Sequence, residues 1–437
     1  MPTENAAPAL MEDAMTRRPG TLTAPDGMDG ATIAAVAERY GTPVWIYDAG
    51  RIRTQINLLR QFDTIRFAQK ASSNLHILRL MRKEAVMVDA VSAGEIERAL
   101  AAGYTPGGDE DPIVFTADVL DRQTLQRVAD LGVPVNVGSP QMVEQLGEIS
   151  PGHPVWIRVN PGFGHGHSQK TNTGGPASKH GIWHEDLTDV VESVDRHGLD
   201  LIGLHMHIGS GVDYGHLERV CESMVRDAKR IDHDIRAISA GGGLTVRETV
   251  ADPIVDTDRY FRLWDDARHE LTAHLGHHVR LEIEPGRFLV ANSGVLVAEV
   301  RAFKRMGSNR FVLLDAGFND LIRPALYGSS HGTEVITREG DRRDGDVSAT
   351  VLAGPLCESG DVFTQSPDGV VEHAPLPAVV VGDLVVFMNT GAYGASMSSN
   401  YNSRPLAPEV LIDGGAVRLI RRRQTIDDLL ALEDVAE

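Results

Sequence analysis

Short apolar runs rich in β-branched residues alternate with longer segments of helical periodicity over the first two thirds of the chain. After an initial run at residues 44–47, they occupy residues 66–70, 87–91, 113–117, 134–138, 155–160, 201–207, 235–240 and 280–284. Strands that alternate with helices are typical of an α/β fold with a parallel sheet. Eight strands after the initial one match a (β/α)8 barrel, which usually takes about 250 residues. We therefore predict a TIM-like barrel over residues 48–290.

The segments between the runs have the signals of helices. Apolar and small residues recur at the spacing of one helical face at Ile96, Ala99, Leu100 and Gly103. Ser139 and Pro140 predict a helix start, because serine can cap free amides and proline suits the first turn. Gly147 is expected to end that helix.

Beyond residue 291 the pattern changes to strands without long helices. We predict strands at residues 295–303, 311–315, 349–353 and 384–388, and a hairpin that turns at Asp413, Gly414 and Gly415. Residues 338–346 are expected to form an exposed loop and residues 425–432 a final helix. Residues 291–437 thus form a predicted β-rich domain. Residues 21–47 are expected to pack with it, and residues 1–20 to be a disordered leader.

Composition excludes several functional classes. The chain has 437 residues and is 42% hydrophobic, which is ample for a buried core. No apolar run reaches the roughly 18 residues of a spanning helix, and no signal peptide is recognisable, so we expect a cytoplasmic protein without membrane contact. The formal net charge of −19 opposes binding to nucleic acid. Two cysteines, Cys221 and Cys357, are too few for a disulfide framework or a thiolate metal cluster.

Polar residues gather at the C-terminal ends of the predicted barrel strands, where barrel enzymes hold their active sites. Lys70 ends the first strand, where partial desolvation would favour a nucleophilic amine suited to Schiff-base chemistry. A solvated lysine is the alternative. Three glycines follow the seventh strand, and with Ser210 and Arg287 they could hold a phosphate, although a tight turn would also need glycine.

Pyridoxal phosphate would use both features, since it has one aldehyde and one phosphate. Glu284 could then pair with the pyridine nitrogen, and His207 could stack on the ring. Each residue also has an ordinary structural explanation, because alternation on a half-buried strand accounts for Glu284 and packing accounts for a strand histidine.

The histidines also allow a zinc-dependent barrel hydrolase. Its candidate ligands are His205 and His207 on one strand with His165 and His167 in a glycine-rich loop. No carboxylate stands at ligand spacing in that loop, so we predict no metal site.

Several longer motifs add a resemblance to a known family. They are FAQKASSN, VDAVSAGE, WIRVNPGFGHGHSQKTNTGGPASKHGI, HMHIGSG, SAGGG, EIEPGR, DAGFNDLIRPALYG, AGPLCESGDVF and NTGAYGASMSSNYNSRP. Together they resemble the diaminopimelate decarboxylases, from about Thr21 to the C-terminus. The lysine, HIGS, triple-glycine and EPGR elements are similar to the wider alanine-racemase-type pyridoxal phosphate enzymes, so SKHGI, IRPALY and CESGD are the more specific ones. Many relatives have Ala-Asn after the lysine, whereas this chain has Ala71-Ser72.

The resemblance implies roles for individual residues. Lys70 would be the Schiff-base lysine, with His207, Glu284 and Cys357 as the other catalytic residues. The implied cofactor contacts are Lys70, Asp89, Arg158, His207, Ser210, Gly241, Gly242, Gly243, Glu284, Pro285, Gly286, Arg287 and Tyr393. The implied substrate contacts are Arg287, Arg323, Tyr327, Glu358 and Tyr393. Cys357 would donate a proton from a second subunit, which makes the expected protein a homodimer with shared active sites.

The predicted function is the pyridoxal phosphate-dependent decarboxylation of meso-2,6-diaminopimelate to L-lysine and carbon dioxide, the last step of lysine biosynthesis. The alternatives within the fold are a decarboxylase of another basic amino acid and an amino-acid racemase. A non-catalytic pyridoxal phosphate carrier would need the barrel alone, so the β-rich domain with CESGD argues against it.

Overall fold

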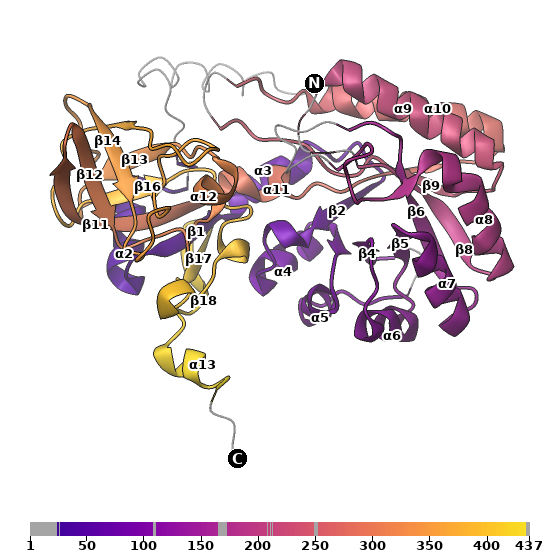
Figure 1. Cartoon of the computed structure of the whole chain (residues 1–437), viewed down its shortest axis with the longest axis horizontal. Coiled ribbons are helices and arrows are strands. Elements are labelled where there is room, and N and C mark those ends of the chain that lie inside the picture. Colours follow the sequence, from indigo (N-terminus) through magenta and orange to yellow (C-terminus); the bar gives the residue numbers. More distant parts are fainter. Residues whose placement is uncertain are drawn as a thin grey trace.

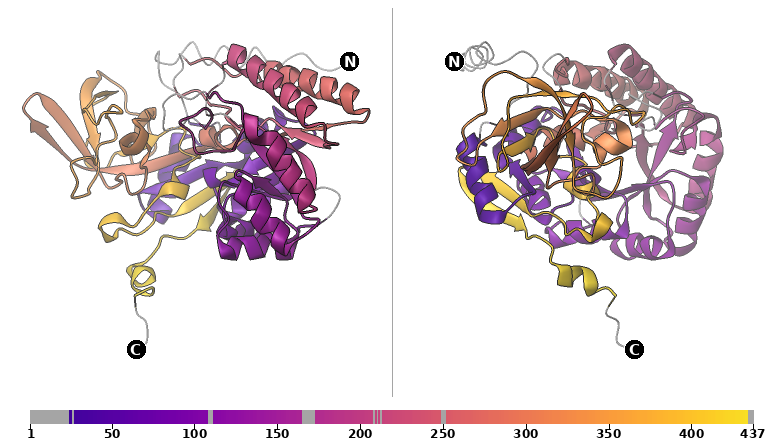
Figure 2. Two further views of the ribbon diagram at one scale, coloured as in Figure 1. Left: turned by 45° about the vertical axis from the view of Figure 1, so that its right-hand side comes forward. Right: turned by 60° about the vertical axis from the view of Figure 1, so that its left-hand side comes forward.

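The computed structural model describes residues 24–25, 27–107, 111–164, 173–207, 209, 211, 213–248 and 252–433. It consists of a barrel surrounded by helices and a second, mixed sheet beside it (Figure 1). The two parts lie side by side in the left view of Figure 2, and the last helix extends from the body in both views. Among the described residues, no helix is both long enough and apolar enough to cross a membrane.

Eight parallel strands close the barrel, which confirms the predicted fold class. They are β2 (Thr64–Ala68), β3 (Met87–Ala90), β4 (Ile113–Ala117), β5 (Val135–Val137), β6 (Pro154–Asn160), β8 (Asp200–His205), β9 (Ala237–Ser239) and β10 (Arg280–Ile283). Closure is complete because β10 pairs with both β2 and β9, and β5 pairs with β6. A short strand that the sequence did not predict, β7 (Ile182–Trp183), pairs with β6 outside the ring.

Helices cover the outside of the barrel. They are α4 (Leu75–Lys83), α5 (Ala93–Ala101), α6 (Arg122–Leu131), α7 (Pro140–Ile149), α8 (Leu187–Arg196), α9 (Tyr214–Ile231) and α10 (Thr257–Leu275). Most begin at a side chain that accepts a hydrogen bond from a free backbone N–H of the first turn; the capping residues are Asn74, Ser92, Asp121, Asp213 and Asp256.

Two details predicted for α7 are wrong. Ser139 makes no capping bond, and its hydroxyl donates instead to the carbonyl oxygen of Asp118. The helix also continues past Gly147 to Ile149. Gly147 is needed for packing, because a Cβ atom there would lie 2.4 Å from the Cβ of His197.

The second sheet has nine strands. They are β1 (Val44–Asp48), β11 (Gly294–Met306), β12 (Asn309–Leu314), β13 (Thr333–Ile336), β14 (Ser348–Ala353), β15 (Ala374–Leu376), β16 (Leu384–Phe387), β17 (Glu409–Asp413) and β18 (Ala416–Arg421). The predicted hairpin is present as β17 and β18, and residues 338–346 are mostly exposed. The sequence did not predict the short strands β13 and β15.

The N-terminal part of the described chain belongs to this sheet. β1 pairs antiparallel with β11 and parallel with β17. Helix α2 (Gly30–Tyr40), which the sequence did not predict, buries Ile33 and Val36 in a cluster with residues of β1 and β11.

Three further helices are short. Helix α3 (Ala49–Asn57) contacts α11 (Arg287–Val290) near the entry to and exit from the barrel. The last helix, α13 (Ile426–Leu430), is shorter than predicted and starts at a capping box made by Thr425 and Asp428. The predicted disordered leader lies outside the described residues.

Candidate active site

A pocket of about 510 Å³, partly open to solvent, lies at the C-terminal ends of the barrel strands. It is lined by Ala68, Lys70, Asp89, Thr116, Arg158, His205, His207, Gly242, Gly243, Leu244, Glu284, Gly286, Arg287 and Tyr393. The structure therefore brings together ten of the residues that the sequence assigned to the cofactor: Lys70, Asp89, Arg158, His207, Gly242, Gly243, Glu284, Gly286, Arg287 and Tyr393. Two more, Gly241 and Pro285, support this pocket through their backbone, since their carbonyl oxygens accept hydrogen bonds from Glu284 and Ala68. Ser210 lies outside the described residues.

Lys70 stands in a single helical turn, η2 (Gln69–Ala71), directly after β2. Its side chain is exposed, so the predicted desolvation of the amine is wrong. The strand ends at Ala68, so Lys70 stands in the turn beyond the strand end, where it lines the pocket. Gln69 anchors the turn, because its side-chain amide donates to the carbonyl oxygen of Glu95 at 3.0 Å.

Glu284 follows β10 and is held as a carboxylate. Its Oε2 accepts a hydrogen bond from Nε2 of His205 at 2.8 Å, and its Oε1 accepts one from the Ser239 hydroxyl at 2.9 Å. Burial alone would raise the pKa of Glu284, but His205, Ser239 and nearby Arg66 lower it to about 2. The group is therefore ionised at neutral pH.

Asp89 and Arg158 are buried side chains from β3 and β6. Burial, reinforced by the charge of Glu284, raises the pKa of Asp89 to about 8. Its Oδ1 has no hydrogen-bond partner among the described residues. Burial lowers the pKa of Arg158, whose Nη2 donates to the carbonyl oxygen of His207 at 3.3 Å.

His207 presents a neutral ring to the pocket. Burial is the main cause that lowers its pKa far below the usual value, and the charges of Arg158 and Lys70 add to it. The backbone of His207 is fixed as well, because the Thr173 hydroxyl donates to its carbonyl oxygen at 2.9 Å.

The glycines form a close backbone cradle. A Cβ atom on Gly242 would lie 2.6 Å from the carbonyl oxygen of Glu284, and one on Gly243 would lie 2.5 Å from that of Gly209. Gly243 also has a φ of +105°, which side chains rarely adopt. The N–H of Gly211 donates to the Gly243 carbonyl at 3.0 Å, so the two glycine turns touch.

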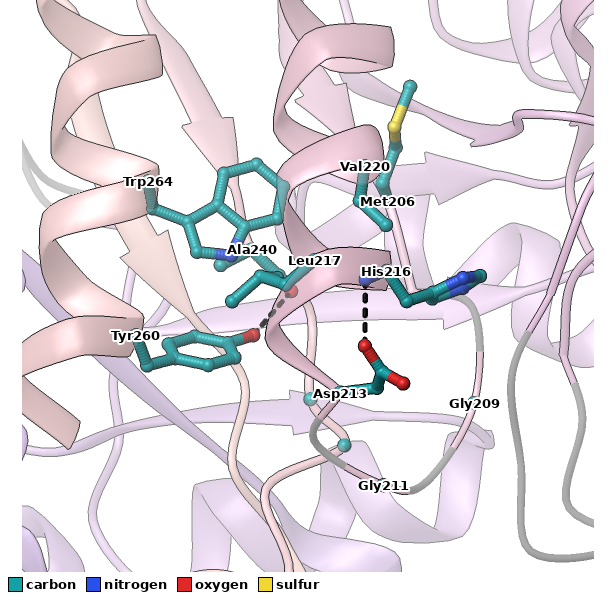
Figure 3. A pocket seen from close by; sticks show the side chains of 12 residues that line it. Met206, Gly209, Gly211, Asp213, His216, Leu217, Val220, Ala240, Tyr260 and Trp264 are labelled. Carbon is teal, nitrogen blue, oxygen red and sulfur yellow. Dashed lines mark hydrogen bonds between the residues drawn. The ribbon is translucent and has the colours of Figure 1, made fainter. Parts of the chain in front are cut away.

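The N-terminus of α9 lies beside these turns. Figure 3 shows the adjoining pocket, in which Asp213 accepts a hydrogen bond from the His216 N–H at 2.9 Å and Tyr260 and Trp264 form the opposite wall. Glycine turns and a helix N-terminus together favour an anion such as phosphate.

Arg323 and Tyr327 lie at the two ends of the short helix α12 (Arg323–Tyr327). Arg323 is 4% exposed, and its Nη2 donates to the Ser329 hydroxyl at 3.0 Å. Burial and the neighbouring Arg287 lower the pKa of Arg323 to about 10, and its Nε has no partner among the described residues. The guanidinium of Arg287 lies 5.2 Å from the ring centroid of Tyr393. Two guanidinium groups thus stand close to each other near the pocket, although Arg323 and Tyr327 do not line it.

Cys357 and Glu358 do not line the pocket of their own chain. Cys357 is a free, exposed cysteine whose N–H donates to Oδ1 of Asn402 at 2.9 Å. Its loop is fixed by the buried Asp361, whose carboxylate accepts from the N–H groups of Leu356 at 2.8 Å and Phe318 at 2.7 Å.

The residues proposed for zinc are not assembled within the described part of the chain, where no group of three or more His, Cys, Asp or Glu side chains could hold a metal ion. His205 is hydrogen-bonded to Glu284 instead. His165 and His167 lie outside the described residues.

The sequence assigned no role in the cofactor pocket to several residues that the structure places there. His205 and Ser239 hold Glu284, and Thr116 is part of the lining. In the SKHGI segment, Nδ1 of His180 lies 2.6 Å from Oδ2 of Asp118, which ties this segment to the end of β4. The only available signal was the position of these polar residues near predicted strand ends.

The pocket fits pyridoxal phosphate. It contains an amine on Lys70, an ionised carboxylate on Glu284 that can hold a proton on a ring nitrogen, and a glycine cradle for a phosphate. The buried, unpartnered Oδ1 of Asp89 is a further polar atom that such a ligand could satisfy.

Comparisons with known proteins agree with this geometry. Residues 50–291 match the family described as pyridoxal-dependent decarboxylase, pyridoxal binding domain. The chain is 69% identical over 409 residues to diaminopimelate decarboxylase of Streptomyces coelicolor, covering 94% of this chain and 93% of that protein. A crystal structure of diaminopimelate decarboxylase is similar with a TM-score of 0.90 and 61% identity, covering 93% of this chain and 97% of that one. The enzyme of Helicobacter pylori complexed with L-lysine is similar with a TM-score of 0.81 and 30% identity, covering 92% of this chain and 99% of that one.

Proposed function

The chain belongs to the diaminopimelate decarboxylase family, and from this premise we propose that it removes one carboxylate from meso-2,6-diaminopimelate. The products would be L-lysine and carbon dioxide, in the last step of lysine biosynthesis. The observation that supports this most is the single pocket that joins Lys70, the ionised Glu284 and the glycine cradle, with Arg287 at its edge.

Pyridoxal phosphate, when bound, supplies a protonated pyridine ring that accepts the electron pair left behind when the substrate loses carbon dioxide. Lys70 would hold the cofactor through its amine. Glu284 would keep the proton on the pyridine nitrogen, because its carboxylate is ionised at neutral pH. The neutral ring of His207 would lie against the cofactor without adding a positive charge to it.

The remaining cofactor contacts that we propose surround these three residues. The glycine turns would bind the phosphate through backbone amides, with the arginine and tyrosine at the pocket edge. This set comprises Asp89, Arg158, Ser210, Gly241, Gly242, Gly243, Pro285, Gly286, Arg287 and Tyr393.

The substrate has a second amino-acid end that must be recognised. Arg287 and Arg323 would bind carboxylate, because a guanidinium fork matches two carboxylate oxygens. Burial of Arg323 strengthens such a contact, since solvent screens it less. Tyr327, Tyr393 and Glu358 would complete the contacts to the substrate.

We propose that two chains share each active site. Cys357 and Glu358 are exposed, and both are absent from the pocket of their own chain. A thiol in the neighbouring subunit could then donate a proton to the substrate carbon after carbon dioxide leaves. This makes the functional unit a homodimer.

We also propose a division of the chain into a barrel at residues 48–290 and a β-rich domain at residues 291–437 to which residues 21–47 are added. The pairing of β1 with β11 and β17 supports this division.

A cytoplasmic location is also proposed. It is supported by the two free cysteines, since reducing compartments keep thiols unpaired.

The test is carbon dioxide release from the diaminopimelate isomers, ornithine, arginine and lysine, assayed side by side on the same protein. Release from the meso isomer with formation of L-lysine is the expected result. Faster release from ornithine or arginine, or racemisation without release, would reject the proposed substrate.

A further inference from the structure

His205 lies at the end of β8, deep in the pocket. Its side chain is 1% exposed and that of Glu284 is 8% exposed, and their contact joins Nε2 to Oε2 at 2.8 Å. Strand β9 lies between β8 and β10 in the barrel, so the two side chains meet across the inside of the wall.

The direction of this hydrogen bond is set by Glu284. An ionised carboxylate can only accept, so the hydrogen must stand on Nε2 of His205. The opposite ring nitrogen, Nδ1, is buried without a partner among the described residues. The ring thus makes a single hydrogen bond here, and that bond is to Glu284.

The other carboxylate oxygen is fixed in the same way. The Ser239 hydroxyl accepts from the N–H of Gly241 at 3.1 Å, so its own hydrogen is directed at Oε1 of Glu284. With one donor on each oxygen, the plane of the carboxylate is defined. Hydrogen bonds to the charged form also favour ionisation.

We propose that His205 is a positioning residue, which fixes the ionised carboxylate of Glu284 for contact with the pyridine nitrogen of the cofactor. This inference rests on the proposed function only for the identity of the cofactor. It does not depend on the identity of the substrate. It assigns the first histidine of the HMH motif a task separate from that of His207.

The experiment measures binding to the cofactor-free protein. The two ligands are pyridoxal phosphate and its 1-deaza analogue, in which carbon replaces the ring nitrogen, and the readout is a fluorescence titration. His205→Leu removes the donor and keeps the bulk. Loss of a hydrogen bond to a charged group should weaken binding of pyridoxal phosphate by about tenfold to a hundredfold. Binding of the analogue should change little, because it makes no contact that depends on the charge of Glu284.

Three further variants serve as controls. His205→Gln retains an N–H at similar reach and should restore most of the affinity. His205→Asn keeps a polar group that is too short to reach Glu284, so it should lower binding of pyridoxal phosphate as His205→Leu does. If the leucine variant does not fold, the asparagine variant takes its place in the test. His153→Leu removes a buried histidine that bonds to Val133 and Ser150 instead, and it should not discriminate between the ligands.

Equal weakening for both ligands, or no weakening, would overturn the inference. Wild-type protein that binds both ligands equally would overturn it too, because Glu284 would then make no use of the ring nitrogen. A selective loss in His205→Leu, combined with no carbon dioxide release from diaminopimelate, would uphold the inference and reject only the proposed substrate.

Discussion

The backbone N–H of Tyr393 donates a hydrogen bond of 2.9 Å to the carbonyl oxygen of Ala71, the residue that follows Lys70. The Ser396 hydroxyl donates to the same oxygen at 3.1 Å. Tyr393 has a φ of +55°, and the next residue must be glycine, since a Cβ atom on Gly394 would lie 2.7 Å from the Trp45 ring. A segment that follows β16 of the second sheet therefore fixes the lysine turn of the barrel, and the pocket needs both parts of the chain.

With saturating pyridoxal phosphate, which offsets a weakened contact to the ring nitrogen, the substitution Glu284→Gln should keep the cofactor bound but remove most turnover. A neutral amide cannot hold a proton on the pyridine nitrogen, so the ring would accept electrons less well. Visible absorbance of the purified variant measures its cofactor content, and carbon dioxide release measures its turnover. Near-wild-type turnover in a fully loaded variant would remove Glu284 from this role.

The substitution Arg323→Ala should raise KM for diaminopimelate by about tenfold or more, since a buried charge-assisted pair typically contributes roughly 2 to 5 kcal/mol. Cofactor content should stay unchanged, because Arg323 does not line the pocket around Lys70. Arg342→Ala is the matched control, as its guanidinium is half-exposed and pairs with Glu334. An unchanged KM, or loss of cofactor instead, would assign Arg323 to another task.

Asp89 should make the cofactor-free protein less stable as the pH rises. Burial raises its folded-state pKa to about 8, whereas an unfolded aspartate titrates near 3.9. The folded protein therefore binds this proton more tightly, and the stabilisation is complete below about pH 4 and is lost as the pH approaches 8. The side chain of Asp89→Asn stays neutral throughout. The Tm of the variant minus that of the wild type should therefore increase between about pH 5 and pH 8. A constant Tm difference across this range would contradict the raised pKa.

A mixture of two inactive variants tests the shared active site. Lys70→Ala and Cys357→Ala are mixed under conditions that exchange subunits. Random exchange makes about half of the molecules heterodimers, each with one intact site, so activity should recover to roughly a quarter of the wild-type value. No recovery despite demonstrated exchange would reject the shared site, whereas an active Cys357→Ala protein would reject the proton-donor role alone.

The barrel could be predicted from the sequence because its strands are continuous apolar runs that are buried on both faces. The predicted positions of the strand ends were less accurate. The first barrel strand stops at Ala68, so Lys70 stands in a turn and is exposed where a desolvated amine was expected. Edge strands such as β13 and β15 were missed because strands of three or four residues show too little alternation.

The contacts within the pocket could not be predicted in the same way. His205 and Glu284 are 79 residues apart, and they meet only because the barrel register places the ends of β8 and β10 at one level. The same holds for Gly147 in helix α7. Its local sequence suggested a helix end, whereas the glycine is needed because His197, from another segment, packs against it.

The most direct test of the account identifies the lysine that holds the cofactor. The purified protein is reduced with borohydride, which fixes pyridoxal phosphate to that lysine, and the modified peptide is identified by mass spectrometry after digestion. We expect the label on the peptide that contains Lys70. A label on another lysine, such as Lys179, would contradict the assignment of this pocket.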